Sequence, residues 1–456
     1  MLYGIEIDEL NSLLWKSENP VAICLLNMGS PDLSTKSVHL QQNHLRMLEL
    51  RLWLLLAVTA LAVAGGLALG LALARTPVVQ DYLPSGPAFF HKALVTHVVF
   101  SFQVWLLALL AALAASTASR PGPGLVGVGL AAIGGMLMLV VTLAGWGEAS
   151  LNNYVPVLDH PLYFAGLVLL AIGVAASLWR PGTGLAALGW CYAVALGCFA
   201  LASWRLPAEM DPAFRLERLF WGGGHVLQFV NTGLVMVAWQ RLSGHQPTKL
   251  SRLAFVLLAL GASAAVVVEL RFDPQGLAWR QAYTHLLWYM LPLPPVLMAA
   301  DVLAASWRKL DWRSLAGWAL LASFWVFALG GGAGFALGAG DTRTPSHYHA
   351  MIGGVNVALM GVVICLLLPS LGRPIGSPRL PRWQIGLYGG GQLLHALGFY
   401  LAGLAGVARK TAGAEQGLDS VFKLVSMGVV GLGGAVAVLG GVLFVGQVLT
   451  RLVRHD

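Results

Sequence analysis

Residues 346–369 read SHYHAMIGGVNVALMGVVICLLLP, a stretch without one charged side chain and with two histidines at its start. The hydrocarbon core of a bilayer is about 30 Å thick and needs about 20 apolar residues of helix to cross it. This stretch is therefore predicted to be a membrane-spanning helix whose first turn carries two imidazoles.

The rest of the chain has the same character. Of 456 residues, 57% are hydrophobic and only 11% are charged, with a mean hydropathy of +0.73. A soluble protein carries about 25% charged residues, so this composition argues against a soluble enzyme or a disordered chain. Four cysteines without a close pair indicate neither a disulfide scaffold nor a CxxC metal site. The net charge of +8 does not indicate nucleic acid, because the basic residues lie between apolar runs.

Twelve apolar runs long enough to span a bilayer follow one another with short loops between them. They cover about 53–75, 91–116, 124–146, 160–179, 183–204, 217–240, 250–270, 281–306, 314–338, 346–369, 383–407 and 423–450. Backbone groups in lipid must be satisfied within the segment, which favours helices. We therefore expect an all-α polytopic membrane protein, a twelve-transmembrane-helix bundle over 51–456. Residues 1–50 are predicted to be a polar, disordered leader, or the true start lies near Met47.

Loop charges orient the bundle. If the N-terminus is cytoplasmic, the loops after the even-numbered spans and the C-terminal tail face the cytoplasm. They carry 13 Lys and Arg against two Asp, whereas the loops after the odd-numbered spans carry 11 Lys and Arg against ten acidic residues. The positive-inside rule favours this orientation.

In this orientation, ionisable side chains gather in the outer third of the bundle. Spans 2, 6, 8 and 10 run inward, and span 7 ends at the outer face. The residues concerned are His97, His225, His285, His347 and His349 in the first turns of the inward spans, and Glu269 at the outer end of span 7. Such residues inside a membrane are costly and mark functional sites.

The pair His347 and His349 indicates cofactors. Two residues along a helix correspond to about 200° of rotation, so the rings point to opposite sides and suit two flat cofactors rather than one metal ion. Imidazole is a common axial ligand of haem iron. His97 at a similar depth is a natural second ligand for one of two haems, whereas a haem with one protein ligand keeps a face open for a gas.

Simpler interpretations apply to several further polar residues. His91 and His160 are typical of interfacial histidines, and His395 in mid-span is interpreted as a hydrogen-bonded core residue. For Glu269, the simpler interpretation is an ion pair with Arg271 or Arg280.

Over nearly all of residues 51–450, the pattern resembles subunit I of the haem-copper oxidase superfamily, which has twelve spans with histidines on spans 2, 6, 7 and 10. Three segments carry the resemblance, and the third is closest to the B-type oxidases. They are Leu94-Val95-Thr96-His97 through Trp105, Leu219-Phe220-Trp221-Gly222-Gly223-Gly224-His225, and Ser346-His347-Tyr348-His349 with Leu366-Leu367-Leu368-Pro369. The resemblance implies that His347 binds a high-spin haem and that His97 and His349 bind a low-spin haem. Arg409-Lys410 resembles the basic pair that holds haem propionates.

The second metal site departs from the family. Phe229 stands where the oxidases have a tyrosine, and Glu269-Leu270 stands where they have a His-His pair. A histidine with a carboxylate suits non-haem iron better than copper, and related nitric oxide reductases use iron and glutamate. The resemblance thus implies a non-haem metal, iron or copper, bound by His225 and Glu269, with His285 as a further ligand.

The expected function is a membrane dihaem reductase of a small diatomic gas, with His225, Glu269 and His347 as catalytic residues. NO reduction to N2O is favoured, because it needs two electrons and no phenol, whereas dioxygen reduction, the second expectation, needs four. Two further functions fit the sequence less well: a non-catalytic dihaem protein for electron transfer or gas sensing, and a transporter.

Partners and location follow from the resemblance and the loops. No CxxCH motif for covalent haem occurs, so electrons are expected from a cytochrome c or cupredoxin type subunit, or from quinol. The expected location is the bacterial inner membrane, with the haems towards the periplasmic side.

Overall fold

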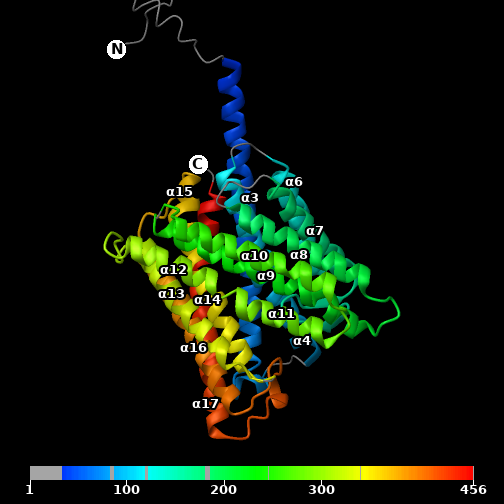
Figure 1. Cartoon of the computed structure of the whole chain (residues 1–456). Coiled ribbons are helices and arrows are strands. Elements are labelled where there is room, and N and C mark those ends of the chain that lie inside the picture. Colours follow the sequence, from blue (N-terminus) through cyan, green and yellow to red (C-terminus); the bar gives the residue numbers. More distant parts are fainter. Residues whose placement is uncertain are drawn as a thin grey trace, which may run out of the picture.

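The computed structural model describes residues 33–82, 87–118, 122–179, 185–244, 246–338 and 340–454. These residues form long helices packed side by side (Figure 1). Strand β1 (Glu148–Ser150) pairs antiparallel with β2 (Val157–Asp159) in the loop between the helices at Gly124–Leu143 and Pro161–Ser177.

The helices follow the predicted runs closely. In chain order they are α3 (Leu33–Leu73), α4 (Pro87–Val98), α5 (Trp105–Thr117), α6 (Gly124–Leu143), α7 (Pro161–Ser177), α8 (Ala186–Arg205), α9 (Pro212–Leu242), α10 (Lys249–Arg271), α11 (Leu277–Met290), α12 (Leu293–Ser306), α13 (Leu315–Ala333), α14 (Arg343–Val362), α15 (Leu368–Ser370), α16 (Arg379–Leu404) and α17 (Val421–Val453). Short 3-10 turns lie at Val79–Tyr82, Gly334–Ala336 and Gly413–Gln416.

Within the described residues, nine helical segments are long and apolar enough to cross a membrane. The all-α membrane class is therefore confirmed, whereas the count of twelve stays a prediction. Of the remaining three expected spans, α7 is apolar but has only 17 residues. Helices α9 and α16 are long but carry polar side chains in mid-helix, such as Asn231 and Gln392, which lowers their apolar character.

Two spans are continuous helices with a π-helical segment. Val99–Val104 joins α4 to α5, and Val363–Leu367 joins α14 to α15. π-Segments occur often near functional sites because the extra residue rotates one half of a helix against the other. Both segments belong to the spans that carry His97, His347 and His349.

Helix α3 is longer than its predicted span. Its 41 residues correspond to about 60 Å of helix, twice the thickness of a bilayer core, and its first part projects beyond the bundle (Figure 1). The predicted boundary at residue 51 thus lies inside a continuous helix, and Glu49 and Leu50 are already buried. Residues 1–32 of the predicted leader over 1–50 lie outside the described residues, so the domain division stays a prediction.

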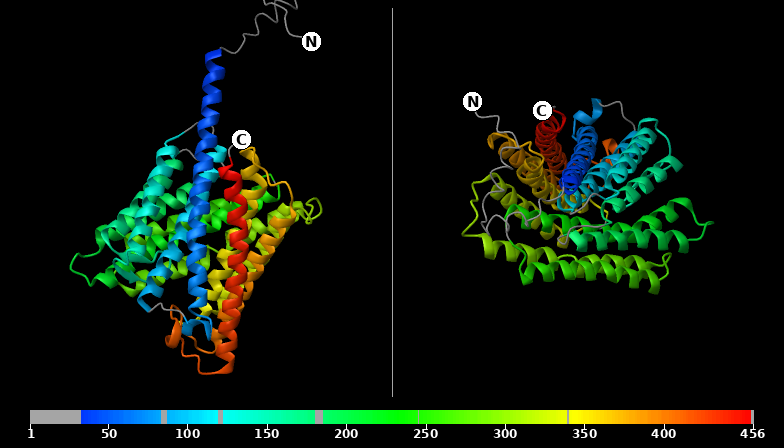
Figure 2. Two further views of the ribbon diagram at one scale, coloured as in Figure 1. Left: turned by 180° about the vertical axis from the view of Figure 1, so that it is seen from behind. Right: turned by 90° about the horizontal axis from the view of Figure 1, so that it is seen from above.

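Helices α3 and α17, the first and the last among the described residues, lie side by side, and α16 packs along α17 (Figure 2). The start of α3 and the end of α17 lie at the same end of the bundle (Figure 1). The loops that lead into α4 and α17 lie at the opposite end, and the functional residues gather there.

Candidate functional site

A cavity of about 1040 Å³ opens between the helices near this end of the bundle. Pockets for small ligands usually measure about 300–1,000 Å³, so this cavity lies at the upper end of that range and suits a large ligand. Four histidines line it: His97 of α4, His347 and His349 of α14, and His395 of α16.

Three of these histidines are anchored as ligand histidines usually are, and one of them is His395, whose Nδ1 lies 2.7 Å from the carbonyl oxygen of Val430. The Nδ1 of His97 lies 2.9 Å from the carbonyl oxygen of Ala64 in α3, and the Nδ1 of His347 lies 2.7 Å from that of Gly330 in α13. A carbonyl oxygen only accepts, so each Nδ1 carries the proton and donates it. The Nε2 atoms keep their lone pairs, which is the arrangement seen in most metal-bound histidines.

The two histidines of α14 contact different helices. His347 contacts α13 through Gly330, whereas His349 packs against His395 of α16 with ring centroids 4.5 Å apart. A glycine at 334 makes room for the first ring, because a Cβ there would lie 2.8 Å from Cε1 of His347. The two-residue spacing thus places the ring of His347 against α13 and the ring of His349 against α16.

Hydrogen bonds to α16 fix the first turns of α14. Thr342 donates its hydroxyl to the carbonyl of Phe399 at 2.8 Å, and Ser346 donates to the carbonyl of Ala396 at 2.7 Å. Arg343, the first residue of α14, pairs with Asp341 at 2.8 Å, and this contact holds the pKa of the Asp341 carboxyl below its usual value.

Three cations border the cavity in the loops at this end. They are Arg75 after α3, and Arg409 and Lys410 after α16. Arg75 donates from Nε to the carbonyl of Thr411 at 2.8 Å, and Lys410 donates from Nζ to the carbonyl of Leu151. Burial lowers the pKa of Arg75 to about 10, and burial with the nearby Arg409 charge lowers that of Lys410 to about 8.

None of these three cations forms an ion pair with a carboxylate in the part of the chain that the structure describes. The three side chains are partly buried, and partly buried cations without a partner charge are costly, so this end of the cavity suits an anionic ligand group. Free imidazole nitrogens along the wall and cations at one end together fit a haem, which offers iron and two carboxylates. Arg75 was missed from sequence because it follows an ordinary apolar span.

The predicted second-metal residues lie outside this cavity. The Nδ1 of His225 lies 2.6 Å from the carbonyl of Trp221, and the ring of Tyr154, which lines the cavity, packs edge-on against His225 at 4.7 Å. His225 is buried and does not line the cavity. It therefore sits behind Tyr154 rather than next to His347.

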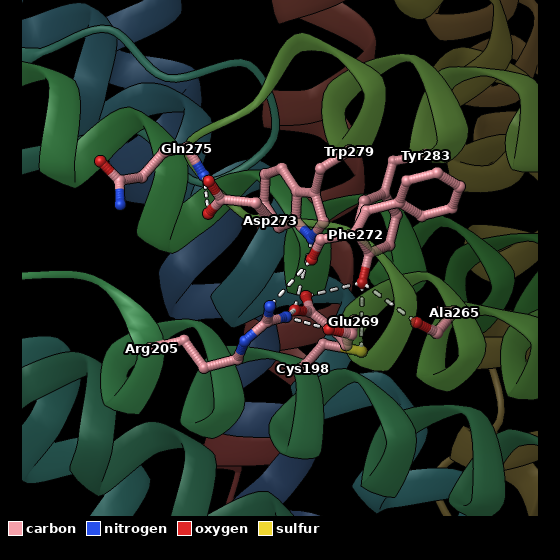
Figure 3. A network of polar contacts seen from close by, with 9 residues as sticks. All are labelled: Cys198, Arg205, Ala265, Glu269, Phe272, Asp273, Gln275, Trp279 and Tyr283. Atoms are coloured by element: carbon pink, nitrogen blue, oxygen red, sulfur yellow. Dashed lines mark hydrogen bonds and ion pairs between the residues drawn. The ribbon is translucent and has the colours of Figure 1, made fainter.

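Glu269 is completely buried and already bonded to protein groups (Figure 3). Tyr283 donates its hydroxyl to Oε1 at 2.7 Å, and Trp279 donates its Nε1 hydrogen to Oε2 at 3.3 Å. Arg205 of α8 lies 3.8 Å from Oε2 and also donates to the backbone carbonyl of Glu269. The simpler interpretation, an ion pair, is thus the observed state, but with Arg205 in place of Arg271 or Arg280.

His285 does not approach either residue. It is exposed on α11, and its ring contacts Tyr289 at 5.9 Å. Among the described residues, no three His, Cys, Asp or Glu side chains come together in a metal-binding group. The predicted non-haem metal site of His225, Glu269 and His285 is therefore not assembled, because the carboxylate is satisfied within the protein and one imidazole faces away.

Phe229, at the position of the missing tyrosine, is fully buried and does not line the cavity. Its ring packs on α10, where a Cβ at Gly261 would lie 2.6 Å from it. The side chain acts as a packing residue between α9 and α10.

No protein-family model matches the chain. Two curated relatives carry no functional description: an uncharacterized protein of Rickettsia prowazekii, RP382, 24% identical over 86% of this chain and 94% of its own length, and one of Aquifex aeolicus, 28% identical over 69% and 84%.

Among solved structures, a heme-copper terminal oxidase dimer superposes with a TM-score of 0.75 at 15% identity, over 90% of this chain and 84% of that one. The likeness establishes that the chain has the fold of that oxidase.

Proposed function

We propose that this chain is a membrane-embedded dihaem oxidoreductase of the terminal-oxidase type that binds and reduces a small diatomic gas. The observation that carries the proposal is that His97 and His347 line one cavity, each with Nδ1 bonded to a backbone carbonyl and Nε2 left free. The fold shared with a heme-copper terminal oxidase supports it.

Each histidine has a role in this proposal. His97 from α4 and His349 from α14 would hold the low-spin haem, and His347 would hold the high-spin haem. When bound, the haems supply electron transfer and an open iron face for a gas. The protein orients the imidazoles through Ala64 and Gly330 and excludes water with the apolar wall of the cavity.

The cations orient the haems. Arg75, Arg409 and Lys410 bind the propionate carboxylates, and charge-assisted hydrogen bonds of this kind are stronger than neutral ones. These three side chains would thus hold the carboxylate side of a bound haem at the basic end of the cavity.

NO is the favoured substrate. Two NO molecules with two electrons and two protons give N2O and water, a reaction that needs no phenol at position 229. Dioxygen reduction to water needs four electrons and is the less favoured reaction. The residues present do not fit a second metal, so no step of the proposal involves one.

A second candidate function is a dihaem protein that transfers electrons or senses a gas without turnover. It is favoured by the bonded state of Glu269 and by the position of His225 behind Tyr154, because neither side chain lines the cavity that His347 lines.

The proposal extends to the surroundings of the chain. Electrons come from a cytochrome c or cupredoxin type subunit, or from quinol. The chain lies in a bacterial inner membrane with its N-terminus in the cytoplasm and the haems towards the periplasm.

The test is a set of reduced-minus-oxidised spectra, with and without CO, on the purified protein and three variants. His347→Ala is expected to lose the high-spin, CO-binding haem, and His97→Ala the low-spin spectrum. The exposed His44→Ala on α3 is the control and keeps both. Wild-type protein without haem, or spectra unchanged by both cavity substitutions, would show the proposal to be wrong.

A headspace assay for N2O, with NO and a chemical reductant, separates the two candidates. Catalytic N2O formation supports the reductase. Two haems that bind CO and NO without turnover support the electron-transfer or sensing protein.

A further inference from the structure

His395 was interpreted from sequence as a packed core residue, and it is indeed buried and hydrogen-bonded. It also lines the cavity, on the same face of α16 as Gln392 and Phe399, which precede and follow it by three and four residues. Positions three and four apart lie together on one side of a helix. This face is the one that α16 presents to His349.

Three aromatic rings meet there. The His395 ring is nearly perpendicular to that of His349, at 82° and 4.5 Å, and Phe399 stacks on His349 at 27° and 5.6 Å. His395 and Phe399 also pack edge to face, with centroids 4.6 Å apart. The plane of His349 is therefore bounded by two rings from one helix.

His395 is itself held firmly by α17. Its Nδ1 donates to the carbonyl of Val430 at 2.7 Å. The backbones of α16 and α17 are in contact at this point, because a Cβ on Gly433 would lie 2.3 Å from the backbone nitrogen of His395. A ring with a fixed backbone and a fixed hydrogen bond has little freedom to rotate.

Among the described residues, His349 has no backbone anchor of this kind, and its ring is hydrogen-bonded instead to the side chain of Gln392 on α16. Its neighbours on α16 are Gln392, close to its ring, and the two aromatic rings, and no hydrogen bond to a backbone carbonyl comparable with those of His97 and His347 occurs among the described residues. Its ring plane thus depends on α16.

We propose that His395 is a positioning residue that sets the ring plane of His349, the axial ligand of the low-spin haem. The inference rests on the proposed function, because it requires that His349 binds a haem. Neighbours of a ligand histidine commonly fix its orientation and tune the metal, and here the role falls to a non-ligand imidazole fixed by α17.

The experiment uses the purified full-length protein and electron paramagnetic resonance of the oxidised low-spin haem, whose g values depend on the angle between the two axial imidazole planes. Haem content and the CO-binding band of the second haem are measured on the same samples. The variants are His395→Ala, His395→Phe, which keeps a ring but loses the donor to Val430, and His349→Ala. The exposed His44→Ala is the control.

The expected result for His395→Ala is a shifted and broadened largest g value, with both haems still present and the CO band unchanged. His395→Phe is expected to shift it less, and His349→Ala to lose the low-spin signal.

An unchanged signal in both His395 variants would overturn the proposal. Loss of the low-spin haem in His395→Ala and His395→Phe, with the CO-binding haem intact, would also overturn it, because His395 would then be a ligand. Wild-type protein without haem would instead show the proposed function to be wrong.

Discussion

Lys410 has an unusual backbone for a lysine. Its φ of 63° lies in the left-handed region, which a non-glycine residue adopts at a cost of about 1–3 kcal/mol and mostly at functional sites. The carbonyl of Lys410 contacts Nε2 of His91 at 3.2 Å, and its amine faces the basic end of the cavity. Because this conformation lowers the stability of the fold, we interpret Lys410 as a functional residue that acts through its positive charge.

The pKa of Lys410 predicts a pH dependence of haem retention. In the protein without haem this pKa is lowered to about 8 by burial and by Arg409, so above pH 8 the amine must take up a proton before it pairs with a propionate. Haem affinity should therefore fall with rising pH, by up to about tenfold per pH unit above 8.

The measurement is the rate of haem transfer to a soluble scavenger between pH 7 and 10. Lys410→Met should show weaker retention at pH 7 and a smaller slope above pH 8. Identical slopes in both proteins would contradict the assignment of Lys410 to a propionate.

Contacts between helices, rather than single residues, define the environment of Glu269. The carboxylate of α10 bonds to Tyr283 of α11 and pairs with Arg205 of α8, so three helices meet at one buried charge. A buried group that loses its partner costs about 1–3 kcal/mol. This network is interpreted as structural.

Tyr283→Phe tests that interpretation. We expect it to lower the free energy of unfolding by about 1–3 kcal/mol, measured as a lower thermal midpoint in detergent, with haem and metal content unchanged. Tyr289→Phe on the same helix is the matched control, because its side chain is 71% exposed. Loss of one non-haem metal ion per chain in the Tyr283 variant would contradict the structural role. That result would support the predicted metal site at Glu269.

Glycines set the distance between α16 and α17. A Cβ on Gly433 would lie 2.3 Å from the nitrogen and 2.7 Å from the Cα of His395, whereas nothing lies within 4 Å of one on Gly428. Backbone atoms cannot move aside as a flexible side chain does, so close approach at Gly433 requires glycine.

Gly433→Ala should therefore separate α16 from α17, at a cost typical of overpacking, about 1–3 kcal/mol. Gly428→Ala in the same helix should be neutral or slightly stabilising, because alanine is the better helix former. Thermal midpoints of the two variants provide the comparison, and equal midpoints would show that the contact is loose.

The orientation of the whole molecule is open to a direct test. The start of α3 and the end of α17 lie at one end of the bundle, and the loop between α16 and α17, which carries Arg409 and Lys410, lies at the other (Figure 1). If the N-terminus is cytoplasmic, a fluorescent protein fused after Asp456 should fluoresce. Alkaline phosphatase should be active when fused within the loop between α8 and α9 and inactive after Asp456. The reverse pattern would place the cavity towards the cytoplasm.

Much of the architecture could be predicted from the sequence, because apolar length and helical spacing are local properties. Each predicted run coincides with helix in the described residues, although α3 starts earlier, at Leu33, and the eighth run divides into α11 and α12 around Leu291 and Pro292. His97, His347 and His349 were singled out from their place in the runs, and all three line one cavity.

The partners of these residues were decided only by the tertiary structure. Arg205 and Glu269 are 64 residues apart, and Arg75 reaches the cavity end beside Thr411. His395 meets His349 because α16 is rotated and held against α17 at Gly433. Such pairings depend on how helices rotate and pack against each other, and this information is not present in the hydropathy or spacing of any one span.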